Sequence, residues 1–293
     1  MGRPLSLPEL DVPHLLRQYR LHPNKTLGQN FLLDEVALIK VVEAADIAPH
    51  DVVLEVGPGL GSLTRHLAQR ARQVVAVEID ATLMPALEQV LSPYSNVTLV
   101  RGDILSLDLA KLVSQPGFLV VANIPYNITS ALIRHLLEAD LPPQRLVLTV
   151  QQEVAQRICA APGDMSLLAL SVQVYGHPEI TASIPAGAFY PPPRVDSSVI
   201  HVERYPAPLI PLSQLEAFFR LIKAGFSQKR KTLRNALSAG LRLPPHSIEV
   251  LLASAQIDPM RRAETLSLEE WHLLTSQFID QFPVKYISWL SPQ

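Results

Sequence analysis

Three groups of residues in the first part of the chain have types and spacing that suit the binding of a nucleoside. The first is a glycine-rich turn over residues 55–61 (EVGPGLG), the second is Glu78, 21 positions after Gly57, and the third is Asp103. Glycines let a backbone turn sharply and approach a ligand closely. A carboxylate about 20 residues later accepts hydrogen bonds from ribose hydroxyls in nucleotide-binding folds. Asp103 could accept one from the exocyclic amine of adenine, so we predict an adenosine-containing cofactor.

Short apolar runs rich in β-branched residues precede these groups and predict buried strands. They lie at 52–56, 74–79, 97–100, 118–122 and 145–150. Segments with helical apolar spacing lie between them, at 62–70, 81–91 and 129–138. This alternation predicts an α/β fold with a parallel sheet, in which ligands bind at the carboxyl ends of the strands. All three groups follow strands in that way.

The pattern changes further along the chain. Residues 1–50 are expected to be helical and irregular, and strands are expected at 180–184 and 198–202, around a proline-rich loop at 190–194. Beyond the prolines near residue 206 only helices are expected, at 214–224, 232–239, 247–255 and 268–278. We therefore predict two domains: a Rossmann-like domain over 1–205 and a small all-helical domain over 206–293.

Composition and charge narrow the classes of protein. Among the 293 residues 48% are apolar and 18% are charged, which is typical of a globular protein and not of a disordered one. The single cysteine excludes an intrachain disulfide and a cysteine zinc site, and the nine histidines show no metal-ligand spacing. No apolar run approaches the roughly 20 residues of a membrane span, and no signal peptide is visible. We expect a cytoplasmic protein without a metal or a membrane partner.

The net charge of −2 does not by itself indicate a polyanion partner. However, seven basic residues and no acidic one lie between Arg220 and Arg242. A local basic face is a better sign of nucleic-acid binding than the total charge. A solvated helix face would explain this run equally well.

The predicted fourth strand ends in Asn123-Ile124-Pro125-Tyr126, and this motif resembles that of adenine-N6 methyltransferases. Four further motifs accompany it, at 28–32 (GQNFL), 55–59 (EVGPG), 189–197 (FYPPPRVDS) and 226–235 (FSQKRKTLRN). In this order and spacing they are similar to the family of small-subunit ribosomal RNA adenine dimethyltransferases, from about residue 24 to 240. The resemblance implies S-adenosylmethionine as cofactor and dimethylation at N6 of two adjacent adenosines near the 3′ end of 16S rRNA. The resemblance also implies that the partner is the small ribosomal subunit and that the protein acts during the biogenesis of this subunit. We expect the protein to be a monomer.

The chemistry of the motif can be argued from its residues. The N6 lone pair of adenine is delocalised into the ring, and acceptors for the N6 hydrogens help to localise it. The Asn123 oxygen and the backbone carbonyl of Ile124 or Pro125 are suitable acceptors. Pro125 stiffens the turn, and Tyr126 offers a ring on which the target base can stack. No general base is needed, because a methylated adeninium loses its proton readily.

The resemblance also implies roles for individual residues. It implies that residues 1–50 form a segment that caps the cofactor. The residues implied to contact the cofactor are Asn30, Leu32, Gly57, Gly59, Glu78, Asp103 and Asn123. The residues implied to form the catalytic pocket are Asn123, Ile124, Pro125, Tyr126 and Phe189. Phe189 would be the second aromatic wall for a base extruded from the RNA. The residues implied to contact RNA phosphates are Lys223, Lys229, Arg230, Lys231 and Arg234.

Three other functions share part of these sequence features. A dinucleotide oxidoreductase would share the ribose acid, but the glycines read G-x-G-x-G, and such an enzyme gives no account of residues 123–126. A large-subunit (23S) rRNA methyltransferase of the antibiotic-resistance type shares the cofactor motifs, while residues 195–197 and 229–235 favour the small-subunit branch. A non-catalytic RNA-binding assembly factor is expected to have lost residues of the cofactor motifs or of the motif at 123–126, and here these residues are all present. The run 164–168 (DMSLL) departs from the family, which affects RNA contacts of that stretch rather than methyl transfer.

Overall fold

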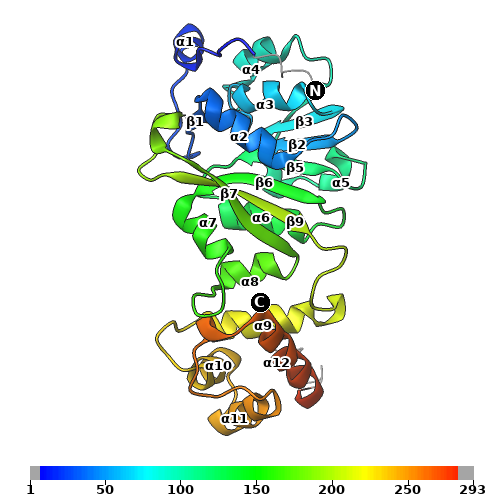
Figure 1. Ribbon diagram of the computed structural model, residues 1–293, viewed down its shortest axis with the longest axis vertical. Coiled ribbons are helices and arrows are strands. Elements are labelled where there is room, and N and C mark those ends of the chain that lie inside the picture. Colours follow the sequence, from blue (N-terminus) through cyan, green and yellow to red (C-terminus); the bar gives the residue numbers. More distant parts are fainter. Residues whose placement is uncertain (1–6, 283–293) are drawn as a thin grey trace. The chain divides into compact units, whose positions relative to one another are not determined.

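The computed structural model describes residues 7–282, which form two compact units (Figure 1). The described part of residues 1–155 and residues 178–204 form the first unit. Residues 156–177 and 205–282 form the second. Within the described residues, no helix has the length and apolar character needed to cross a membrane.

A seven-stranded sheet, in the order β4-β3-β2-β5-β6-β9-β7, organises the first unit. Its strands are β2 (Val52–Val56), β3 (Gln73–Glu78), β4 (Val97–Arg101), β5 (Leu119–Asn123), β6 (Arg145–Gln151), β7 (Gly176–Ile184) and β9 (Ser197–Arg204). Strands β4, β3, β2, β5 and β6 are mutually parallel, so the predicted parallel sheet is confirmed there. Strand β9 runs antiparallel to β6, which the sequence patterns did not indicate. The strand order reverses between β2 and β5, and open sheets bind ligands at such a switch point.

Both faces of the central strands are buried. On one face Val53, Val121, Val147 and Val199 share a core with helices α2 (Glu35–Ala45) and α3 (Ser62–Ala68). The alternate residues of the same strands, such as Leu54, are also buried, which explains why these strands are apolar throughout. Strand β4 differs, because it lies at the sheet edge and none of its residues is fully buried. Further helices of this unit are α4 (Met84–Leu91), α5 (Leu109–Leu112), α6 (Thr129–Leu137) and the start of α7 (Gln152–Ile158).

The N-terminal segment returns to the sheet beside the glycine-rich turn. It contains α1 (Val12–Gln18) and the short strand β1 (Phe31–Leu32), which pairs antiparallel with β8 (Phe189–Tyr190). Phe31 packs in an apolar cluster with residues of α1 and with Leu60 and Leu83. The segment that leads into β1 is therefore held against the turn that follows β2.

The second unit is helical, and no strand follows β9 up to residue 282. Its helices are α8 (Leu167–Gln173), α9 (Leu215–Phe226), α10 (Leu233–Leu241), α11 (Pro245–Ser254) and α12 (Leu268–Gln281). Helix α9 is central and contacts α8, α10 and α12. The close approach of α10 depends on Gly240, since a Cβ there would lie 2.6 Å from that of Ala224.

Residues 156–177 group with this helical unit, whereas the sequence-based division places them before the boundary at 205/206. Helix α8 packs on α9, and the N–H groups of Gly163 and Met165 both donate to the carbonyl of Glu264. In addition, Ser166 caps α8 by accepting from the N–H of Ala169. The run 164–168, which departs from the family pattern, thus forms local structure within the second unit.

Candidate active site

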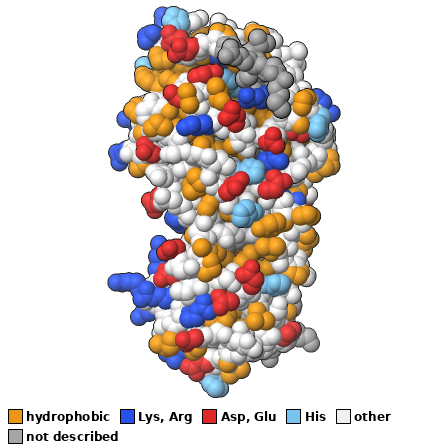
Figure 2. Space-filling view, viewed as in Figure 1, with side chains coloured by type: hydrophobic (Ala, Val, Ile, Leu, Met, Phe, Trp, Pro, Cys, Tyr) orange, Lys and Arg blue, Asp and Glu red, His pale blue; other side chains and the backbone are white. Residues whose placement is uncertain are grey.

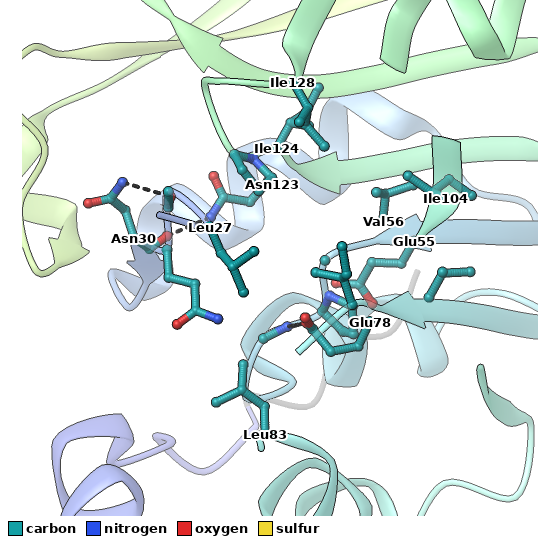
Figure 3. A pocket seen from close by; sticks show the side chains of 18 of the residues that line it. Leu27, Asn30, Glu55, Val56, Glu78, Leu83, Ile104, Asn123, Ile124 and Ile128 are labelled. Atoms are coloured by element: carbon teal, nitrogen blue, oxygen red, sulfur yellow. Dashed lines mark hydrogen bonds between the residues drawn. The ribbon is translucent and has the colours of Figure 1, made fainter. Parts of the chain in front are cut away.

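A pocket in the first unit lies at the carboxyl ends of the central strands (Figure 3). The pocket is open to solvent, and the space within it and at its mouth that no atom fills is about 1140 Å³. All seven predicted cofactor residues line it, and so do Ile124, Pro125 and Tyr126. The lining comes mainly from residues 27–32, 55–60, 77–79, 102–105 and 123–128. Folding therefore brings together segments that are up to about 100 positions apart.

The glycine-rich turn gives the pocket a floor of bare backbone. Gly57 has φ +70° and Gly59 has φ +60°, a region that residues with a side chain rarely adopt. A Cβ at Gly59 would also lie 2.9 Å from Cδ1 of Phe31. The two glycines thus permit both the turn and the close packing of the N-terminal segment over it.

Two carboxyl groups lie side by side in the wall of the pocket (Figure 3). Glu78 accepts from the N–H of Gly59 at 3.0 Å and from that of Asp80 at 2.8 Å, so it stabilises the turn while facing the pocket. Burial raises the pKa of the Glu78 carboxyl, and these backbone N–H groups lower it in part. Burial also raises the pKa of Glu55 to about 8, since this residue is only 1% exposed. The Thr64 hydroxyl lowers the pKa of this carboxyl in part, and Glu55 Oε2 is left without a hydrogen-bond partner among the described residues.

The adenine end of the predicted cofactor site contains Asp103. One of its carboxylate oxygens accepts from the N–H of Leu105 at 3.0 Å, which fixes the side chain and leaves the second oxygen for a ligand. Gln29 closes the site from the N-terminal segment by donating to Asp80 Oδ2 at 2.7 Å. The hydrogen bonds from Gln29 and Thr82 lower the pKa of Asp80 against the opposing effect of burial, which is the largest cause. Within residues 7–282 no group of three or more His, Cys, Asp or Glu side chains is placed to hold a metal ion.

The side chain of Asn123 has one fixed orientation. Its Nδ2 donates to the backbone carbonyl of Asn30 at 2.9 Å, and Asn30 Nδ2 donates in turn to the carbonyl of Gly28 at 3.1 Å (Figure 3). A backbone carbonyl can only accept, so the NH2 group of Asn123 must point toward Asn30. The Oδ1 atom is left as an acceptor in the pocket wall.

The turn after Asn123 is held by hydrogen bonds of its own. Pro125 accepts from the N–H of Ile128 at 3.2 Å, and Tyr126 accepts from the hydroxyl of Thr129 at 3.3 Å through its carbonyl. The Pro125 carbonyl keeps a second lone pair, and the Ile124 carbonyl precedes it. Tyr126 is half-buried, and burial raises the pKa of its hydroxyl, so its ring is a neutral wall of the pocket.

Phe189 does not line this pocket. It lies opposite Leu32 in the β1–β8 pair, is 4% exposed, and packs in the same core as Val199. Because side chains alternate along a strand, the neighbouring Tyr190 is the exposed one. The expected second aromatic wall is therefore part of the core in this arrangement.

The predicted phosphate-binding residues lie in the second unit and differ in their availability. Lys223, on α9, and the three basic residues 229–231 have exposed side chains. Figure 2 shows Lys and Arg side chains projecting at the left edge of this unit, where Figure 1 draws the loop between α9 and α10. In contrast, Arg234 is half-buried and forms an ion pair with Glu249 at 2.7 Å. It has a structural role in joining α10 to α11.

The sequence patterns predict no separate role for Glu55 or Gln29, although these residues belong to the motifs at 55–59 and 28–32. The signal for Glu55 was available, since it is the one charged residue in the apolar run 52–56. Gln29 had no such signal, because its partner Asp80 is 51 positions away and only the folded chain brings them together.

Taken together, the reversal of strand order, the bare glycine turn and the oriented amide define a Rossmann-like methyltransferase. Solved structures agree with this class. A dimethyladenosine transferase from Plasmodium falciparum superposes with a TM-score of 0.71 and 26% identity, covering 86% of this chain and 98% of that one. The 23S rRNA methyltransferase ErmE gives a TM-score of 0.68 and 30% identity, covering 85% and 99%.

The chain belongs to the ribosomal RNA adenine dimethylase family, whose model matches residues 20–280. Similar relatives carry the name ribosomal RNA small subunit methyltransferase A. One from Dehalococcoides mccartyi is 46% identical over 89% of this chain and 90% of its own length. Another from Alkaliphilus metalliredigens is 41% identical over 90% of this chain and 94% of its own.

Proposed function

We propose that the protein transfers methyl groups from S-adenosylmethionine to N6 of two adjacent adenosines near the 3′ end of 16S rRNA. It acts as a cytoplasmic monomer on the assembling small ribosomal subunit and produces N6,N6-dimethyladenosine. The observation that carries this proposal is the fixed amide of Asn123, which offers an acceptor in the wall of the pocket that the predicted cofactor residues line. Relatives named for the small subunit reach 46% identity, against 30% for the 23S enzyme, and this supports the choice of subunit.

The residues of the pocket fit the cofactor. When bound, S-adenosylmethionine supplies an electrophilic methyl group on a sulfonium. Glu78 has lone pairs left for ribose hydroxyls, and the second oxygen of Asp103 suits an adenine amine. The turn at Gly57 and Gly59 lets the backbone approach the methionine portion. The unpartnered oxygen of Glu55 is a further polar atom that a bound polar ligand would satisfy.

For the target adenine, the chain supplies acceptors and a stacking surface. Asn123 Oδ1 and the carbonyl of Ile124 or Pro125 accept the two N6 hydrogens, which concentrates the lone pair on N6. The Tyr126 ring stacks on the extruded base and holds N6 in line with the methyl group. An amide cannot remove a proton, and none needs to be removed before attack.

In the second unit, four exposed basic residues are proposed to bind RNA phosphates without reading sequence: Lys223, Lys229, Arg230 and Lys231. Arg234 contributes through its ion pair with Glu249 and not as a free cation. Replacing Arg234 should therefore lower the stability of the helical unit, whereas replacing the exposed lysines should lower only the affinity for RNA.

The test is methyl transfer from labelled S-adenosylmethionine to small ribosomal subunits that lack this modification, with large subunits in parallel and nucleoside analysis of the product. We expect dimethyladenosine on the small subunit alone. The Asn123→Ala variant should lose about 100-fold or more in kcat, by analogy with removal of one transition-state hydrogen bond. Its cofactor binding, measured by calorimetry, is expected to weaken far less.

Each arm of the experiment has a distinct meaning. Label on the large subunit alone would refute the assignment to the small subunit. No label on either subunit, with cofactor binding intact, would refute methyl transfer to ribosomal RNA. Full activity of Asn123→Ala would refute the role of the oriented amide.

A further inference from the structure

The hydroxyl of Tyr126 forms a hydrogen bond with a side chain from a distant part of the chain. It lies 2.7 Å from the hydroxyl oxygen of Ser197, 71 positions further along. Ser197 is 0% exposed, whereas Tyr126 lines the pocket and is half-buried. The hydroxyl end of Tyr126 is thus hydrogen-bonded to a residue of the sheet, while the ring of Tyr126 borders the pocket.

Ser197 is held firmly by its place in the sheet. It is the first residue of β9 and lies opposite Gln151 in the antiparallel pair with β6. Asn123 lies opposite Thr149 of the same β6, two residues before Gln151. Because positions two apart on a strand share a face, Ser197 and Asn123 lie on the same face of the sheet, and both are paired with residues of β6.

The residue before Ser197 strengthens this anchor. The Asp196 side chain accepts from the N–H of Ala186 at 2.9 Å, and its carbonyl accepts from the N–H of Gln152 at 3.1 Å. The start of β9 is therefore fixed on two sides. The Ser197 hydroxyl at this point is therefore a hydrogen-bonding partner with a fixed position for a side chain of another segment.

We infer that Ser197 is a positioning residue for methyl transfer, which holds the Tyr126 ring at the angle needed for stacking the target adenine. The inference rests on the proposed function and deepens it. A tyrosine has two rotatable side-chain bonds, and a hydrogen bond at its far end restricts both. Burial raises the pKa of the Tyr126 hydroxyl, so the group stays protonated in neutral solution and the bond persists.

The test compares three variants under saturating cofactor. Ser197→Ala and Tyr126→Phe each remove the same hydrogen bond, from opposite sides. Ser198→Ala is the matched control, since Ser198 is the next residue of β9, is 2% exposed, and points to the opposite face. The measurements are kcat and KM for small subunits, cofactor affinity by calorimetry, and the unfolding midpoint.

We expect Ser197→Ala and Tyr126→Phe to lower kcat by similar factors, about threefold to tenfold, as for one lost neutral hydrogen bond. Cofactor affinity should stay unchanged, and Ser198→Ala should keep the wild-type kcat. The double variant Ser197→Ala/Tyr126→Phe should be no slower than either single variant, because both act through one bond.

Multiplied losses in the double variant would overturn the inference, since Ser197 would then act on something other than Tyr126. An unchanged kcat in Ser197→Ala would overturn it as well. If Ser197→Ala does not fold, Tyr126→Phe still deletes the bond without touching β9, and an undiminished kcat there has the same meaning. An inactive wild-type protein refutes the proposed function instead, so the two failures are distinguishable.

Discussion

Replacing Glu55 by Gln should change how the stability of the protein depends on pH. Burial of Glu55 in β2 raises the pKa of its carboxyl from 4.5 to about 8 in the folded protein. Below pH 4.5 the group is protonated in both the folded and the unfolded chain, so it adds no pH dependence. As the pH rises from 4.5 to about 8, the unfolded chain releases this proton while the folded one retains it. The wild type therefore loses stability across that window, and Gln, which has nearly the same shape, does not.

The size of the effect follows from the linkage between proton binding and unfolding. Each pH unit inside the window changes the free energy of unfolding by about 1.4 kcal/mol for one proton. Between pH 5 and pH 7 the stability of Glu55→Gln relative to the wild type should thus rise by about 3 kcal/mol. Above pH 8 the difference should level off, because both states of the wild type are then ionised.

The assay is urea unfolding followed by far-UV circular dichroism at pH 5, 6, 7 and 8, for the wild type and the variant side by side. Glu88→Gln serves as the control, because Glu88 is exposed on α4 of the same unit. Its difference from the wild type should stay flat across the series. A constant difference for Glu55→Gln, or one that falls as the pH rises, would refute the reasoning.

Three further predictions concern packing and RNA binding. Gly59→Ala should abolish cofactor binding in calorimetry and lower the unfolding midpoint, because a Cβ would meet Phe31 at 2.9 Å in a left-handed conformation; retained affinity would show that the turn can adapt. Gly240→Ala should destabilise the helical unit by about 1–3 kcal/mol or more, since its Cβ would overlap the backbone of Ala224, and Trp fluorescence during urea unfolding measures this. Lys229→Ala should weaken binding to small subunits and reduce the slope of log K against log salt by about 0.7–0.9, while an unchanged slope would remove Lys229 from the phosphate contacts.

Much of the fold and of the site was predictable because it depends on local pattern. The apolar β-branched runs correspond to β2, β3, β5 and β6 to within one or two residues, since a strand buried on both faces must be apolar throughout. The four predicted C-terminal helices correspond to α9–α12, because amphipathic spacing is likewise a local property. Spacing alone also predicts that glycines and acids following strands share one site, and Gly57, Gly59, Glu78 and Asp103 all line the pocket.

What the pattern did not indicate depends on contacts between distant segments. The antiparallel course of β9 is one case, since a strand does not carry its direction in its composition. Phe189 is another: an aromatic residue suits a pocket wall or a core, and only its pairing with Leu32 turned it inward. Arg234 was indistinguishable from its basic neighbours until α11 brought Glu249 within 2.7 Å of it.

The sequence by itself therefore determined the class of fold, the cofactor-sized site and the kind of chemistry. These follow from residue types at short separations along the chain. The tertiary structure decided which way the Asn123 amide points, that the Glu55 carboxyl is almost fully buried, and which serine holds Tyr126. The physical reason is that hydrogen-bond orientation and burial arise from neighbours in space, and those neighbours exist only once the sheet has formed.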